Sequence, residues 1–279
     1  MKNIDTLVED LESVIYGQGG WRKSIAEAMG KNIADVANKR FSKPQEPRGY
    51  LSLSSVGTPC KRKLWYKVNQ PQIGERLDAK MLLKFFYGDM IEELILAMCK
   101  AAGHKVEGMQ DRVTVHGIRG HRDAVIDVKS CSPFAFKKFR DGELRDNDPF
   151  GYISQLSSYV YAAQDDPLVT DKNRGAFLAI DKVNGEICLD VYDFSNELST
   201  KQTEMEAAKA MVAGDIPTER VSPVPASKSS PNTKLDKACQ FCEYKKSCWP
   251  NLRMFEYSYG IEYLVHVEKP PKVPEITNG

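Results

Sequence analysis

The chain has 279 residues, enough for one large domain or for one domain with additions. Apolar residues make up 42% of it, which supports a hydrophobic core, and no run of about 18 uninterrupted apolar residues predicts a membrane span. The net charge of +1 does not by itself indicate a nucleic-acid binder, and seven cysteines behind an acidic, amphipathic N-terminus favour a reducing compartment over a disulfide framework.

The first part of the chain is predicted to be mainly helical. Residues 1–48 are polar and contain helix-like apolar spacing, with a loop over 42–50. The segment "YLSLSSVGTPCKRKLWYKV" begins extended and turns helical around Arg62. A long apolar helix follows over 80–103, and it ends at Gly103 in the manner of a glycine cap.

Strands and helices alternate in the rest of the chain. The pattern predicts strands over 105–115 and 118–130. It then predicts a helix over 148–164, with Asp148 as N-cap and Pro149 as the first helical residue. A hairpin over 175–194, with its turn at Asn184–Gly185, and a last helix over 196–213 follow. A Pro/Ser-rich connection then leads to a cysteine-rich segment. This order of elements predicts an α/β fold with a mixed sheet flanked by helices.

The strand over 118–130 places charge among apolar residues. Asp127 and Lys129 point to the same face, because side chains alternate along a strand. The lysine lowers the cost of burying the carboxylate. The pairing also suits phosphate chemistry, in which carboxylates hold Mg²⁺ or Mn²⁺ and an ammonium binds the phosphate or positions water. The alternative interpretation is an ion pair at a strand edge.

Two helices carry further candidate residues. Glu92 lies on the apolar face of the long helix, where its carboxylate needs a partner such as a metal ion or else reaches past its neighbours to water. Gln155 and Tyr159 stand one turn apart on the helix over 148–164, so they could contact a substrate together, or the tyrosine could belong to the core. Basic clusters at 61–63, 137–140 and 245–246 are either solvated faces or phosphate contacts.

Three cysteines near the end of the chain, Cys239, Cys242 and Cys248, have the spacing C-x2-C-x5-C. Zinc and iron–sulfur sites usually take four thiolates, and Cys60 is the best candidate for the fourth. The spacing leaves both kinds of centre open. A centre closed by Cys60 would be structural, since it ties distant parts of the chain together. The remaining cysteines are expected to be small buried residues, Cys99, Cys131 and Cys188.

Taken together, these pieces resemble the PD-(D/E)XK nuclease superfamily from about Leu51 to Trp249. They are "SLSSVGTPCKRKLWY", "GDMIEEL", "GHRD", "DVK", "QLSSY" and the cysteine triplet. Within it, the chain is similar to the RecB/AddB-like iron–sulfur exonucleases, which include CRISPR-associated adaptation nucleases and bacteriophage relatives. The resemblance implies a restriction-endonuclease-like core, a mixed sheet flanked by helices, with helical and cluster-binding additions.

The resemblance also implies roles for residues. A [4Fe–4S] cluster, or zinc as the other occupant, would be bound by Cys60, Cys239, Cys242 and Cys248. Mg²⁺ or Mn²⁺ would be held by Glu92, Asp123, Asp127 and the carbonyl of Val128. Lys129 would orient or deprotonate water, and Gln155 and Tyr159 match a Q-x3-Y motif expected to contact DNA and support the site.

The implied function is that of a metal-dependent DNA exonuclease acting on free ends or single strands in recombination, repair or phage DNA metabolism. The expected location is the cytoplasm of a bacterial or phage-infected cell, with no membrane partner, and an oligomer is compatible with the resemblance. The expected organisation is an N-terminal helical extension over 1–48, a nuclease domain with its cluster over 49–265, and a flexible tail over 266–279.

One departure from the family pattern favours a second function. Only Ala124, Val125 and Ile126 separate Asp123 from Asp127, where the family has a longer hairpin. Residues four apart in a straight strand lie ~13 Å apart, too far for one ion whose oxygen ligands sit within ~2.5 Å. A bulge or sharp fold is therefore expected here. Without it, the chain would be a non-catalytic, DNA-binding degenerate nuclease that keeps the cluster.

A zinc-stabilised interaction module is a third hypothesis for the chain. It accounts for the cysteines but not for Glu92, Lys129 and Gln155 together.

Overall fold

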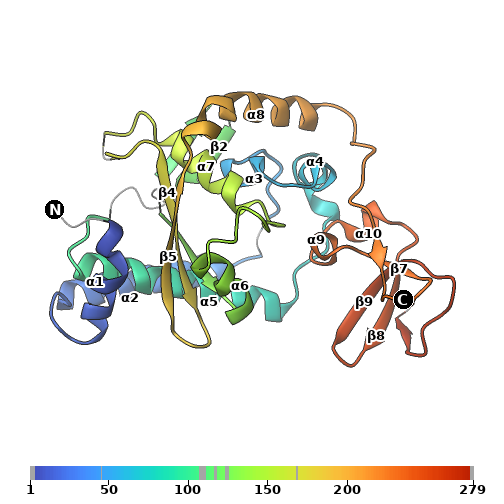
Figure 1. Ribbon diagram of the computed structural model, residues 1–279, viewed down its shortest axis with the longest axis horizontal. Helices are drawn as coiled ribbons and strands as arrows, with labels where there is room; N and C mark the ends of the chain where they lie inside the picture. The colour runs from blue at the N-terminus through green and yellow to red at the C-terminus, as the bar shows by residue number, and fades with distance from the viewer. Residues whose placement is uncertain are drawn as a thin grey trace. The chain divides into compact units, whose positions relative to one another are not determined.

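The computed structural model describes the chain except residues 1–3, 45, 107–110, 116–117, 123–125, 168 and 277–279, and describes only the backbone of 111–115 and 118–122 (Figure 1). The chain divides into two compact units. The first unit comprises Met1–Glu46, Ser52–Gly57 and Leu77–Ala207, and the second comprises Pro47–Leu51, Thr58–Arg76 and Ala208–Gly279.

The first unit is mixed α/β, as the sequence predicts. Its helices are η1 (Ile4–Thr6), α1 (Leu7–Ile15), α2 (Lys23–Phe41), α3 (Leu53–Val56), α5 (Ala79–Ala101), α6 (Pro133–Arg140), α7 (Tyr152–Ala162) and most of α8 (Ser195–Ala213). Its strands are β1 (Asp111–Val115), β2 (Ile118–Arg122), β3 (Ile126–Cys131), β4 (Arg174–Asp181) and β5 (Ile187–Asp193). β1 and β2 form an antiparallel pair.

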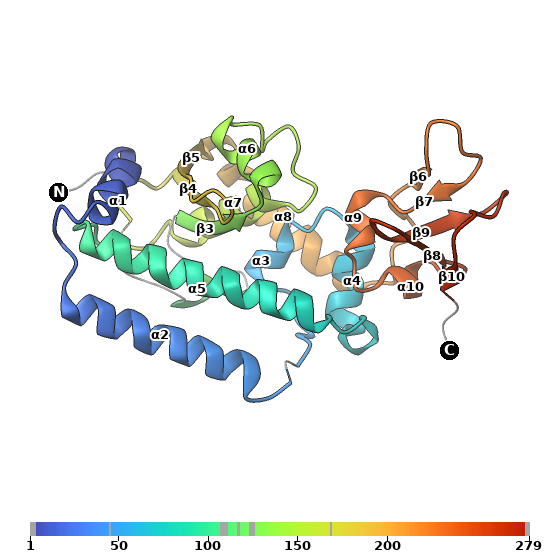
Figure 2. The same ribbon diagram turned by 90° about the horizontal axis from the view of Figure 1, so that it is seen from below.

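The central sheet has the order β3-β4-β5, with β3 parallel to β4 and β4 antiparallel to β5. Helices cover both faces (Figure 2). On one face, Ile126 and Val128 pack with apolar residues of α1 and α5, including Leu11 and Ile95. On the other face, side chains of α6 and α7 pack around Phe177 of β4. Both faces of β3 are thus covered.

Glycines with positive φ end two elements where the sequence predicts. Gly103, with φ of 86°, follows α5, and the amides of Gly103 and His104 donate to the last carbonyls of that helix. Gly185, with φ of 76°, lies in the turn between β4 and β5, so the predicted hairpin is confirmed. Glycine adopts the left-handed conformation at little cost, so the ends of these two elements can be predicted from the local sequence.

The predicted start of α7 is wrong by three residues. The helix begins at Tyr152, after Gly151 in the left-handed region with φ of 76°. Asp148 and Pro149 therefore precede the helix, although the Asp148 carboxylate still accepts a hydrogen bond of 2.8 Å from the amide of Ile153. The glycine interrupts the helical backbone between the capping carboxylate and the first turn.

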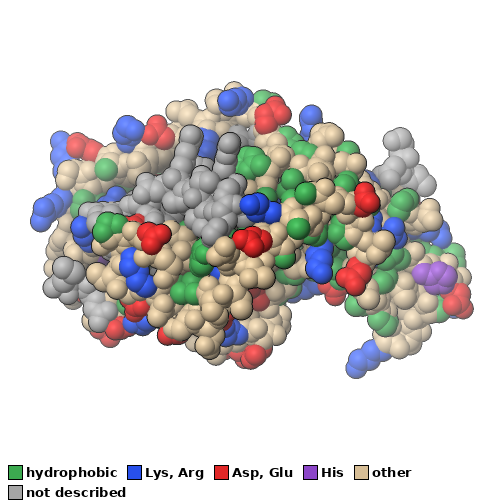
Figure 3. Space-filling model, turned by 90° about the horizontal axis from the view of Figure 1, so that it is seen from above, with side chains coloured by type: hydrophobic (Ala, Val, Ile, Leu, Met, Phe, Trp, Pro, Cys, Tyr) green, Lys and Arg blue, Asp and Glu red, His purple; other side chains and the backbone are tan. Residues whose placement is uncertain are grey.

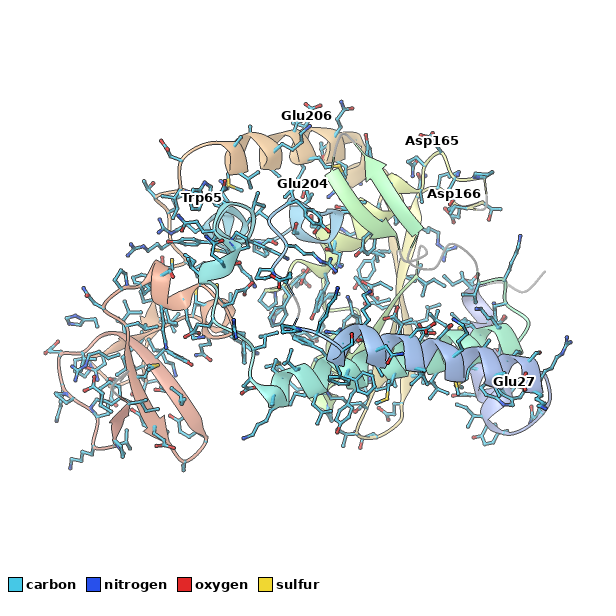
Figure 4. The ribbon with its side chains drawn as sticks, turned by 180° about the vertical axis from the view of Figure 1, so that it is seen from behind. Glu27, Trp65, Asp165, Asp166, Glu204 and Glu206 are labelled. Carbon is cyan, nitrogen blue, oxygen red and sulfur yellow. The ribbon has the colours of Figure 1, made fainter. Side chains whose placement is uncertain are left out.

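A buried lysine links α8 to α7. The side chain of Lys201 is 2% exposed, and its ammonium pairs with Glu204 and lies 3.3 Å from the hydroxyl of Ser154. Glu204 in turn accepts a hydrogen bond of 2.7 Å from Ser154. Figure 4 shows Glu204 on the inner side of α8 and Glu206 on the outer side. The lysine is thus buried with a charged partner.

The second unit joins short helices to a small antiparallel sheet. Its helices are α4 (Lys61–Asn69), η2 (Pro71–Ile73), α9 (Lys237–Gln240) and α10 (Lys245–Cys248), beside the end of α8. Its strands are β6 (Val224–Pro225), β7 (Thr233–Lys234), β8 (Arg253–Tyr257), β9 (Gly260–His266) and β10 (Glu275–Ile276), in the order β10-β8-β9-β7-β6.

Two segments predicted as irregular contain strands. The Pro/Ser-rich connection carries β6 and β7, and the tail predicted as flexible carries β10, which pairs with β8. Short polar strands of this kind gain their backbone partners only from the tertiary structure. None of the helices in the described ranges is long and apolar enough to span a membrane.

Candidate functional site

Asp127 and Lys129 lie together on the face of β3 that turns toward α6 and α7. Their neighbours Ile126 and Val128 occupy the opposite face, as strand alternation predicts. Lys129 Nζ lies 2.8 Å from Asp127 Oδ2, and the two side chains are 20% and 9% exposed, respectively. The charged pair is therefore largely withdrawn from water inside the first unit.

The carboxylate of Asp127 retains an unused accepting oxygen. Oδ2 is buried, and no residue in the described part of the chain donates a hydrogen bond to it, because its contact with Lys129 is an ion pair without hydrogen-bond geometry. Buried carboxylate oxygens normally have such partners. A hard divalent cation is one group that would satisfy this oxygen.

Aromatic rings hold the ammonium of Lys129. Its Nζ lies 4.7 Å from the centroid of the Tyr152 ring and 5.9 Å from that of Phe177. Burial raises the pKa of the Tyr152 hydroxyl, and the nearby lysine opposes that rise. The sequence analysis missed this role of Tyr152. The available signal was its position three residues before Gln155, on the same face of α7.

Gln155 and Tyr159 contact each other as their spacing predicts. Gln155 Nε2 donates a hydrogen bond of 2.8 Å to the hydroxyl of Tyr159, whose side chain is buried. Together with Tyr152 they form a polar stripe along α7, which also packs beside β1. The stripe therefore begins at the ring that contacts Lys129.

The structure describes one of the two other predicted carboxylate ligands, Glu92. Glu92 is half-buried on α5, near the point where Gly88 approaches the Ser130 hydroxyl from the opposite face of β3. Asp123 lies outside the described residues. Within the described ranges, no group of three or more His, Cys, Asp or Glu side chains is arranged to hold a metal ion. Among the predicted site residues of β3, Asp127 and Lys129 are in contact.

A second candidate site lies within the second unit, where four thiols line one pocket. They belong to Cys60, Cys239, Cys242 and Cys248. Cys60 is the N-cap of α4, and its sulfur accepts a hydrogen bond of 3.5 Å from the amide of Lys63. The other three lie on α9, directly after it, and at the end of α10. Folding thus brings Cys60 to the triplet.

The electrostatics of this pocket disfavour free thiolates. Burial, followed by repulsion from the other cysteines, raises the pKa of Cys239 to about 12, and burial raises that of Cys242 to about 11. A bound cation would reverse this by stabilising thiolate ligands. The donor set, four sulfurs around one pocket, fits zinc or an iron–sulfur cluster. The thiols line the pocket without the close grouping that would hold an ion.

The three other cysteines lie elsewhere, among apolar residues. Cys99 and Cys131 are buried, Cys188 is half-buried, and all seven cysteines are free thiols. Burial raises the pKa of Cys99 and Cys131 to about 11 and that of Cys188 to about 12. The prediction of small buried residues is therefore confirmed for Cys99 and Cys131, whereas Cys188 is only half-buried.

Two of the predicted basic clusters, 61–63 and 245–246, each contain a residue that is buried and bonded within the protein. Arg62 is buried, and its guanidinium donates to the carbonyl of Pro217 at 2.5 Å and to the Tyr66 hydroxyl at 3.3 Å. Lys245 is buried and paired with Glu75. On the face drawn in Figure 3, Lys and Arg side chains are interspersed with Asp and Glu side chains. The guanidinium of Arg62 is therefore engaged in contacts within the second unit.

Comparison with known proteins adds no relative to this picture. No family model matches the chain, and no curated protein matches it. The candidate sites accordingly rest on their own chemistry.

Proposed function

We propose that the chain is a metal-dependent deoxyribonuclease with a PD-(D/E)XK core, acting as an exonuclease on free ends or single strands of DNA in the cytoplasm. One observation carries the proposal: a buried carboxylate with an unused oxygen, Asp127, lies 2.8 Å from the ammonium of Lys129 on one strand face. A carboxylate for a divalent ion and a cation for the phosphate are the two groups that phosphodiester hydrolysis needs side by side.

The protein's own residues have separate tasks in this mechanism. Lys129 binds the attacked phosphate or orients the attacking water, and Asp127 and the Tyr152 ring hold its ammonium in place. The hydrogen bond between Gln155 and Tyr159 fixes the polar stripe of α7, which supports the strand of substrate next to the site. Fixed positions of this kind lower the barrier because little reorganisation is left for the reaction.

The divalent ion would be Mg²⁺ or Mn²⁺, held by Asp127 with the carbonyl of Val128, Glu92 and Asp123. When bound, it supplies positive charge that stabilises the developing charge on the phosphate. The unused oxygen of Asp127 supports this assignment.

The thiol pocket would hold a [4Fe–4S] cluster, with zinc as the other occupant. Its role is structural, because its ligands join the start of α4 to the segment of α9 and α10 within the second unit. Such centres contribute directly to folding free energy.

Cleavage by variants tests the nuclease proposal. Asp127→Asn and Lys129→Ala should each lower the Mn²⁺-dependent degradation of linear single-stranded DNA by at least about 100-fold. Lys182→Ala, an exposed lysine beyond the end of β4, is the matched control and should degrade DNA as the wild type does. Thermal unfolding checks that each variant is folded. Full activity of Lys129→Ala would overturn the proposal.

The requirement for a free DNA end is tested by comparing linear with circular single-stranded DNA. An exonuclease should degrade linear single strands and spare circular ones of the same sequence, whereas degradation of both at equal rates would indicate an endonuclease.

A non-catalytic DNA-binding protein is the second candidate function. It is favoured by the short spacing from Asp123 to Asp127. DNA binding that is equal in EDTA and Mn²⁺, with no loss of substrate over hours, would support this function instead.

A further inference from the structure

The pocket lined by the four thiols also contains an indole whose N–H group is unused. Trp249 follows Cys248 directly and lines the same pocket. Its Nε1 is buried and makes no hydrogen bond to any residue that the structure describes. An unsatisfied buried donor costs about 1–3 kcal/mol, so a native fold normally supplies an acceptor.

Two other donors that line this pocket have partners. Lys63 Nζ lies 3.4 Å from a Glu243 carboxylate oxygen, and the Tyr66 hydroxyl donates to the carbonyl of Ser247 at 3.4 Å. Another tryptophan of the unit, Trp65, donates its Nε1–H to the carbonyl of Gly214 at 2.8 Å. In this unit a backbone carbonyl thus accepts the indole N–H of Trp65, whereas the indole N–H of Trp249 has no such acceptor in the described part of the chain.

The four cysteines that line this pocket offer sulfur atoms as acceptors. A neutral thiol accepts weakly, but a metal-bound thiolate carries negative charge and is commonly tuned by N–H donors around it. One positive charge also lies over the indole, because the Arg220 guanidinium lies 4.8 Å from the centroid of the Trp249 ring. Four thiolates around a divalent ion leave a net negative charge, and the positive charge of Arg220 complements it.

We propose that the Nε1–H of Trp249 donates a hydrogen bond to a sulfur of the metal centre held by Cys60 and the cysteine triplet. Trp249 is then a positioning residue that spreads the negative charge of the thiolates and holds the metal more tightly. This inference rests on the metal-binding part of the proposed function and not on nuclease activity. Zinc and an iron–sulfur cluster share the required chemistry, a thiolate acceptor.

Metal retention in matched tryptophan variants is the first test. Trp249→Phe removes the N–H and keeps an aromatic ring, while Trp21→Phe, a half-exposed residue of the first unit, is the control. In the full-length protein loaded with zinc, a competing chelator should remove metal from Trp249→Phe about 10-fold more readily than from the wild type. Trp21→Phe should match the wild type. Equal retention by Trp249→Phe and the wild type would overturn the inference.

Reconstitution with iron and sulfide gives a second readout. The midpoint potential of the cluster in Trp249→Phe should fall below that of the wild type, because a hydrogen bond to sulfur stabilises the more negative reduced state. An unchanged potential would contradict the inference.

A measurement on the wild type avoids any folding defect of the variant. The chain has three tryptophans and therefore three indole N–H resonances in an ¹⁵N-labelled sample. Zinc should shift the signal assigned to Trp249 and leave in place the signal of Trp21, which belongs to the first unit. A Trp249 signal that is unmoved by zinc would overturn the inference.

The wild type also separates this inference from the proposed centre. If the wild type and Cys239→Ser both fail to bind zinc and iron–sulfide, the centre itself is wrong and the inference falls with it. If the wild type binds metal and Cys239→Ser does not, the centre stands, and the result with Trp249→Phe decides the role of Trp249 alone.

Discussion

The ammonium of Lys129 lies 4.7 Å from the centroid of the Tyr152 ring. The two residues come from different elements, β3 and α7, so their contact fixes where the lysine points in the first unit. A cation–π contact of a largely desolvated lysine is worth about 0.5–2 kcal/mol. Tyr152 therefore links the polar stripe of α7 to the charged pair on β3.

Two substitutions of Tyr152 should distinguish the contribution of its ring from that of its hydroxyl. Tyr152→Phe keeps the ring and should retain most of the nuclease activity, whereas Tyr152→Leu should lower kcat/KM on linear single-stranded DNA by roughly 10-fold, the equivalent of a lost cation–π contact. Phe150→Leu, whose ring packs against Tyr152, is the control for lost aromatic bulk. Equal activity of Tyr152→Leu and the wild type would show that the ring does not position Lys129.

Removal of one thiol should empty the pocket of metal. Cys239→Ser should lower the metal content of the purified protein, measured by elemental analysis, at least about 10-fold, because thiolate ligands bind zinc and iron as a closed set. Cys188→Ser changes a half-buried cysteine outside the pocket and should leave the metal content unchanged. A similar loss in both variants would place the metal elsewhere or point to general unfolding.

Two glycine substitutions should have opposite effects on stability. A Cβ at Gly175 of β4 would lie 2.8 Å from Val160 Cγ2 and 3.0 Å from Leu156 Cγ of α7, so Gly175→Ala should destabilise the protein by about 1–3 kcal/mol. A Cβ at Gly30 of α2 meets nothing within 4 Å, and Gly30→Ala should stabilise it by about 0.5–1 kcal/mol. Denaturant unfolding measures both. Equal signs would refute the close packing of α7 on β4.

Asp190 should make stability depend on pH. Burial raises the pKa of its carboxyl, although the Tyr192 hydroxyl donates a hydrogen bond that opposes the rise. The folded state then binds the proton more tightly than the unfolded chain. The stability from Asp190 is therefore complete below its ordinary pKa of about 4 and is lost as pH rises through the raised value.

The test is the unfolding temperature between about pH 4 and 7. Asp190→Asn should gain stability relative to the wild type as pH rises, because the amide does not titrate. Tyr192→Phe, which removes the donor that favours the charged carboxylate, should lose stability more steeply than the wild type over the same range. Parallel curves for Asp190→Asn and the wild type would contradict the raised pKa.

Local features of the fold could be predicted where the cause is local. The end of α5 at Gly103 and the hairpin turn at Gly185 follow from positive φ, which glycine adopts at little cost. The shared face of Asp127 and Lys129 follows from the alternation of a strand. The start of α7 could not be placed, because Asp148 has a capping side chain and the left-handed Gly151 decides where the helix begins.

The sequence by itself determined the residue types and their spacing: an acid and a lysine two apart on a strand, a Q-x3-Y spacing on a helix, and a cysteine triplet. Only the tertiary structure decided which partners they meet. It placed Tyr152 over Lys129, brought Cys60 to the pocket of the triplet, and buried Arg62 among structural hydrogen bonds. The reason is physical: periodicity fixes the direction of a side chain on its own element, whereas burial and pairing depend on elements distant in the chain.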